Sequence, residues 1–159
     1  MDDSPKIPEI VAAVMFAASV VVLALAYRYL PEAVPTSFDA SGAAQAFGPK
    51  WTVWLPLAGG ILSYVAIGLA ARTPERFLTL PNITITDENR DFVVRLIRQM
   101  CSWLKMWVLT VIFAIVCMVV QGALTGHARL DIVLFFYGAL GGMVVTLIAF
   151  AVKLRGASA

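Results

Sequence analysis

The stretch IVLFFYGALGGMVVTLIAFAV, residues 132–152, runs for 21 residues without a charged side chain. At a rise of about 1.5 Å per residue, such a helix crosses the roughly 30 Å hydrocarbon core of a bilayer. Residues 10–27, 51–71 and 106–126 are similarly uncharged. None alternates as barrel strands do, so each must satisfy its backbone in lipid as a helix. The sequence predicts one domain, 1–159, with transmembrane helices over about 8–30, 51–71, 101–126 and 130–153.

The composition supports the same class. Hydrophobic residues make up 60% of the 159 residues and charged residues 14%, against about 25% charged in soluble domains. This balance excludes a soluble enzyme and a disordered chain. The net charge of +2 gives no dense basic stripe for nucleic acid. We therefore expect an all-α membrane protein, a four-transmembrane-helix bundle whose first partner is the lipid bilayer.

The basic residues predict the orientation. If the N-terminus is inside, nine Lys or Arg residues lie on the inner face and three on the outer face. We therefore expect a bacterial cytoplasmic (inner) membrane protein with both termini in the cytoplasm. Asp2, Asp3 and Glu9 argue against a cleaved secretory signal, whose first residues are positively charged.

The predicted spans carry few polar groups, and no charged residue lies near a span centre. Pumps and proton relays usually need such residues, so a transporter working alone is disfavoured. Small residues permit close helix contacts, and Gly138 with Gly142 forms a small-xxx-small pair. Two interpretations stay open, packing within the bundle or a seam of a homo-oligomer. The candidate packing residues are Gly59, Gly60, Gly138 and Gly142.

The outer loop, residues 31–50, contains residues that indicate an ordered structure. Its prolines stiffen both ends, residues 39–42 suit an Asx-type turn, and two phenylalanines can anchor it to the helix ends. It is interpreted either as a structural cap or as a binding surface outside the membrane. The candidate binding residues are Pro35, Phe38, Asp39, Gly42, Phe47, Gly48 and Lys50.

The inner segment, residues 72–105, combines a connector with an amphipathic helix. Thr86 is a predicted N-cap, and apolar residues then recur at three- and four-residue spacing into the third span. We expect a cytoplasmic amphipathic extension of the third helix, lying at the headgroups or under the bundle. The candidate residues for docking or lipid contact are Arg90, Arg95, Arg98 and Lys105.

Two stretches resemble a known family. They are Leu30-Pro31, Val34-Pro35-Thr36-Ser37-Phe38-Asp39, Gly42 and Phe47-Gly48-Pro49-Lys50, with a weaker second stretch at Ile85–Asn89, Arg95 and Trp103–Lys105. The pattern resembles a bacterial membrane domain of unknown function that forms the N-terminal part of SdpI-type immunity proteins. The resemblance implies immunity to a secreted toxin, or sequestration of a repressor at the membrane. Ser37 stands where that family usually has a histidine, and the chain stops after four helices whereas full-length relatives carry a further membrane region.

Other chemistry finds little support in the sequence. His127 shares the outer face with Asp131, Glu32 and Asp39, but their spacing does not force them together, and Asp131 is expected to cap the fourth helix. No catalytic or nucleotide-binding motif is present. We expect no enzyme activity, cofactor or metal. The favoured function is an immunity- or sensor-like protein that binds a peptide toxin, regulator or membrane partner through its outer loop. The alternative is an accessory or structural subunit of a transporter or envelope complex.

Overall fold

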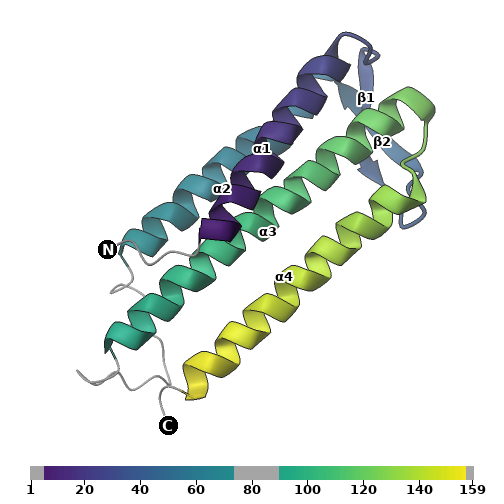
Figure 1. Ribbon diagram of the computed structural model, residues 1–159. Coiled ribbons are helices and arrows are strands. Elements are labelled where there is room, and N and C mark those ends of the chain that lie inside the picture. Colours follow the sequence, from purple (N-terminus) through teal and green to yellow (C-terminus); the bar gives the residue numbers. More distant parts are fainter. Residues whose placement is uncertain (1–5, 74–89, 157–159) are drawn as a thin grey trace.

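A computed structural model describes residues 6–73 and 90–156 (Figure 1). Four of its helices are long and apolar enough to cross a membrane, which confirms the predicted all-α, multi-pass class. The predicted N-cap Thr86 and most of the inner connector lie outside the described residues. In chain order the elements are α1 (Lys6–Tyr27), β1 (Ala33–Phe38), β2 (Ala44–Pro49), the 3-10 helix η1 (Lys50–Trp54), α2 (Leu55–Arg72), α3 (Arg90–Thr125) and α4 (Leu130–Gly156).

Local chemistry sets the helix boundaries. α1 ends at Tyr27, earlier than the predicted 30, because the backbone turns there and Tyr29 N donates to Ala26 O at 2.8 Å. Proline at position 31 then disfavours helical geometry in the residue before it. Pro56 stands in the first turn of α2, where its missing N–H costs nothing. Asp131 lies inside the first turn of α4 rather than before it, so it is not the predicted cap.

α3 is the central helix of the arrangement (Figure 1). It packs against α1, α2 and α4, whereas α4, among the described elements, has its main contacts with α3. A core cluster near one end joins α1, β1, η1, α2 and α3; its buried members are Leu23, Leu30, Val34, Val53, Leu57 and Val116. The remaining apolar surface of these helices faces outward, as expected for a chain surrounded by lipid.

The predicted amphipathic extension is the first part of α3, which runs without interruption into the span. Its residues Val93, Ile97 and Cys101 are buried. Partly buried side chains of α2 and Leu154 of α4 pack against this cluster. The extension therefore lies against the other helices rather than only on the membrane surface.

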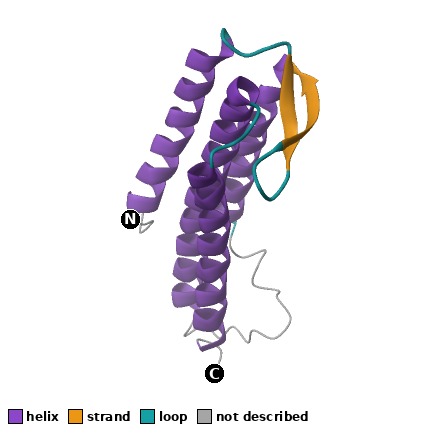
Figure 2. Cartoon of the chain, turned by 90° about the vertical axis from the view of Figure 1, so that its right-hand side faces the viewer, coloured by secondary structure: helices purple, strands orange, loops and turns teal. Residues whose placement is uncertain are grey.

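The predicted outer loop forms a two-stranded antiparallel hairpin, β1–β2. It stands at the end of the helices opposite to the start of α1 and the end of α4 (Figure 1). The connection from α1 crosses the helix ends to reach it (Figure 2). The sequence indicated order in this segment but not strands, since Ala-Gln-Ala-Phe-Gly-Pro has little β propensity.

Two of the four candidate packing glycines lie in contacts within the chain. Gly60 faces Leu109 and Ile112 of α3 at ordinary packing distance. A Cβ on Gly142 would run into the indole of Trp107, so glycine is what lets α4 approach α3 there. Gly59 and Gly138 face open space.

Candidate functional site

The hairpin is fixed to the ends of α3 and α4 by residues that the sequence proposed for binding. The rings of Phe38 and Pro35 cover Gly122 of α3, where an added Cβ would lie 2.5 Å and 3.4 Å from them. Gly42 adopts a left-handed backbone with φ of +86°, and its carbonyl accepts a 2.8 Å bond from Ala128 N. A Cβ on Gly42 would lie 2.8 Å from Ala128 O. These residues therefore hold the hairpin in place.

Asp39 closes the hairpin turn in the predicted Asx geometry. Its Oδ1 accepts bonds from Ser41 N at 2.8 Å, Ser41 Oγ at 2.6 Å and Ala43 N at 2.9 Å. The Ser41 hydroxyl bond, followed by the backbone bond from Ala43, lowers the pKa of Asp39 below its ordinary value of 3.8. Asp39 thus orders the turn as a carboxylate.

The strand β2 keeps one edge and most of its side chains exposed. Lys50 N donates to Glu32 O at 2.9 Å, so the opposite residues 32 and 50 form a hydrogen-bonded pair. Hydrogen-bonded and non-hydrogen-bonded pairs alternate along an antiparallel ladder. The pair Pro35–Phe47 is three positions further along and is therefore a non-hydrogen-bonded pair. The N–H and C=O of Phe47 therefore point to the free edge of β2, and its side chain is 60% exposed.

The two remaining candidates in this segment make local contacts. A Cβ on Gly48 would lie 2.8 Å from the methyl group of Thr36, so a side chain there would disturb the hairpin. The Lys50 ammonium lies 4.9 Å from the centre of the Tyr27 ring, a cation–π geometry. Both contacts tie the hairpin to itself or to α1.

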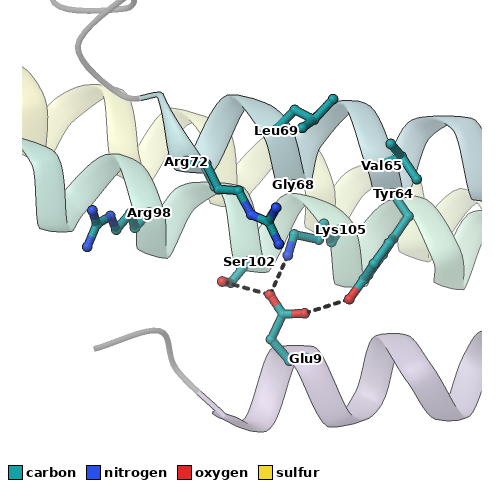
Figure 3. A pocket seen from close by; sticks show the side chains of 10 residues that line it. Glu9, Tyr64, Val65, Gly68, Leu69, Arg72, Arg98, Ser102 and Lys105 are labelled. Carbon is teal, nitrogen blue, oxygen red and sulfur yellow. Dashed lines mark hydrogen bonds and ion pairs between the residues drawn. The ribbon is translucent and has the colours of Figure 1, made fainter. Parts of the chain in front are cut away.

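A second polar site, of which the sequence predicted only the basic residues Arg98 and Lys105, lies near the start of α1, away from the hairpin. Figure 3 shows its side chains. Glu9 of α1 forms an ion pair with Lys105 of α3 at 2.7 Å. Its carboxylate also accepts bonds from Ser102 Oγ at 3.1 Å and from Tyr64 Oη at 3.3 Å. The Lys105 ammonium lies 4.9 Å from the centre of the Tyr64 ring. This cluster, Glu9, Tyr64, Ser102 and Lys105, ties three helices together.

The cluster forms one wall of a pocket of about 690 Å³. Arg72 from the end of α2 and Arg98 from α3 also line it, and the Arg72 guanidinium points toward Lys105 (Figure 3). Gly68, Val65 and Leu69 supply an apolar wall along α2. Among the described residues, the pocket thus combines three cationic side chains, one carboxylate and an apolar side.

The sequence proposed part of this site. Arg98 and Lys105 were expected at the inner face and both line the pocket, whereas Arg90 and Arg95 lie on the same helix outside its lining. Glu9 was missed as a site residue. Its position in the sequence was a usable signal, because an acidic residue in the first turn of a membrane helix usually pairs with a cationic side chain at the same depth.

The described residues that share the outer face with His127 do not form a metal site. In the described parts of the chain, 6–73 and 90–156, no group of three or more His, Cys, Asp or Glu side chains could hold an ion. Asp131 instead pairs with Arg129 at 3.2 Å on the surface. Ala43 pairs with His127 through an isolated β-bridge. The backbone of His127 thus helps to hold the hairpin.

Comparison with known families gives one match. Residues 14–60 match a domain of unknown function, DUF1648. The matched range contains most of α1, the whole hairpin and the start of α2. No curated protein and no solved structure matches the chain. The match therefore covers the hairpin that the sequence resemblance pointed to, and it ends before Tyr64 and the part of α2 that lines the pocket.

Proposed function

We propose that this chain is a non-enzymatic binding protein of the bacterial cytoplasmic membrane, with both termini in the cytoplasm and the hairpin outside. In this proposal it is immunity- or sensor-like, and β2 binds an extended segment of a peptide by adding it as a further strand. The single observation that carries the proposal is the free edge of β2 beside the exposed ring of Phe47.

The edge has the properties that strand addition requires. An exposed strand offers unpaired N–H and C=O groups to an extended chain, and proteins usually protect such edges with charged residues. β2 has no charged residue between Ala44 and Pro49. The hairpin is held rigidly by Phe38, Pro35 and Gly42, so little ordering is needed on binding.

The resemblance to SdpI-type immunity proteins supports a peptide toxin as the occupant. That resemblance rests on the hairpin residues, which also fall in the range matched by DUF1648. Ser37, which replaces the usual histidine of that family, is exposed on β1. The proposed binding therefore depends on the β2 edge and not on position 37.

The experiment expresses the chain in a bacterial strain that is sensitive to membrane-active peptide toxins. The variant Phe47→Pro removes the outward N–H and the ring, Phe47→Ala removes the ring alone, and Tyr29→Ala is the control. Tyr29 is matched because it is 61% exposed at the same end and lies outside β2. We expect protection against at least one peptide, lost in Phe47→Pro, weakened in Phe47→Ala and kept in Tyr29→Ala.

Two results would overturn this proposal. One is that the wild-type chain protects against no peptide in a broad panel. The other is that Phe47→Pro, present in the membrane at normal level, protects as well as the wild type.

One observation favours a second candidate function, an accessory subunit of a transporter or envelope complex. α4 has its main contacts with α3, and Gly138 faces open space, so another helix can approach α4 there. A cysteine at Gly138 should then crosslink to another protein or to a second copy in membranes. Crosslinks confined to the same chain would remove this candidate.

A further inference from the structure

We propose that the pocket beside Glu9 and Lys105 binds the phosphate group of an anionic ligand. This site is independent of the peptide-binding hairpin, since it lies at the other end of the helices (Figure 1). The phosphate could belong to a phospholipid headgroup or to a soluble phosphate compound, and the experiment below separates these two sources.

The charge of the pocket selects an anion. Among the described residues, the lining holds three cationic side chains, Lys105, Arg72 and Arg98, and one carboxylate, Glu9, so this part of it carries a positive excess. Glu9 uses its bonds to hold Lys105 in place, with the ammonium side chain only 11% exposed. Arg72 and Arg98 are exposed, and they can turn their N–H groups to phosphate oxygens, which guanidinium binds in a bidentate manner.

The position of the pocket fits a headgroup. Lys105 precedes the last residue of α3, Thr125, by 20 residues. This length of helix is about 30 Å, the thickness of the hydrocarbon core. With Thr125 at the hairpin end, Lys105 is then placed at the opposite boundary of the membrane, where lipid phosphates lie.

The shape of the pocket fits an amphiphile. Its volume of about 690 Å³ is in the range of small-molecule sites. Val65 and Leu69 of α2 are exposed, and they give an apolar side next to the cationic groups. An acyl chain can lie along this side while the phosphate contacts the arginines.

Gly68 offers a way to fill the pocket without disturbing the helices. It lines the pocket, and a Cβ built there meets nothing within 4 Å. Gly59 on the same helix has equally open surroundings and lies outside the pocket lining. Since both changes replace glycine within one helix, Gly59→Phe is the matched control for Gly68→Phe.

The experiment titrates the full chain, purified in detergent, with three probes. These are short-chain phosphatidylglycerol, short-chain phosphatidylcholine and inorganic phosphate, with affinity measured by native mass spectrometry and calorimetry. We expect phosphatidylglycerol to bind at least about tenfold more tightly than phosphatidylcholine. Arg72→Gln should weaken this binding about tenfold, as the loss of one charge-assisted contact does. Gly68→Phe should abolish binding, and Gly59→Phe should leave it unchanged.

Each result decides the proposal. Preference for phosphatidylglycerol without phosphate binding assigns a lipid, and phosphate binding that Arg72→Gln weakens assigns a soluble phosphate compound. Equal affinity for the two lipids together with no phosphate binding would overturn the proposal. Undiminished binding in Gly68→Phe would also overturn it. Arg72→Gln changes an exposed side chain, so undiminished binding in that variant is the overturning result if Gly68→Phe does not fold.

Discussion

The ion pair between Glu9 and Lys105 gives the most decisive test of the packing at the pocket. The two side chains are 27% and 11% exposed, and the N–O distance is 2.7 Å. Exposed ion pairs contribute about 0.2–1 kcal/mol to the free energy of unfolding, and hydrogen bonds to charged groups contribute about 1.5–3 kcal/mol. Because this pair is only partly exposed, we expect a coupling free energy of about 1–2 kcal/mol, between those limits.

The single variants Glu9→Ala and Lys105→Met should lower the free energy of unfolding by different amounts. Glu9→Ala leaves the largely buried Lys105 ammonium without its carboxylate, and it also removes the acceptor of the Ser102 and Tyr64 hydroxyls. Lys105→Met leaves Glu9 more exposed and still bonded to both hydroxyls. We therefore expect Glu9→Ala to cost about 2–4 kcal/mol and Lys105→Met about 1–3 kcal/mol.

The measurement is a double-mutant cycle on the purified chain, with the free energy of unfolding followed by helical circular dichroism in mixed detergent. The control cycle is the surface pair Arg129–Asp131, whose side chains are 72% and 63% exposed. We expect less than about 0.5 kcal/mol of coupling there. A coupling free energy for Glu9 and Lys105 no larger than that of the control pair would contradict this prediction.

Two further predictions concern the rest of the molecule. Gly142→Leu should separate α4 from α3, because a Cβ at position 142 runs into the indole of Trp107. Gly138→Leu is the control, because position 138 faces open space. The thermal unfolding temperature should fall in Gly142→Leu only. Asp39 should titrate below 3.8, so its contribution to hairpin stability is present at neutral pH and is lost as the pH falls through the lowered pKa. Amide chemical shifts of the turn report this midpoint, and Ser41→Ala should raise it; a midpoint at or above 3.8 in the wild type would contradict the prediction.

The helices were predictable from the sequence because lipid imposes strong rules on them. Uncharged stretches long enough to span a bilayer admit only a few structures, so 51–71 and 130–153 correspond closely to α2 and α4. The glycines were harder to assign. Gly60 and Gly142 pack against α3 while Gly59 and Gly138 do not, and nothing in the residue type distinguishes them.

The sites were predictable only in part, because both depend on long-range contacts. The hairpin residues were found through their prolines, aromatics and glycines, but the sequence does not show that Phe38 covers Gly122 while Phe47 stays exposed. Glu9 and Lys105 are 96 positions apart, and only the packing of α1 on α3 brings them together. The count of basic residues by membrane face placed Lys105 at the inner face, whereas Glu9 entered only the argument against a secretory signal.

The polar groups within the helices explain why function is assigned to the two ends. The hydroxyls of Ser19, Thr110 and Thr146 each donate to a carbonyl four residues earlier in their own helix. In the described part of the chain, no buried polar side-chain atom lacks a partner. These hydroxyls are therefore satisfied within their own helices. Our two proposals therefore rest on exposed groups at the ends of the helices, the β2 edge at one end and the arginines of the pocket at the other.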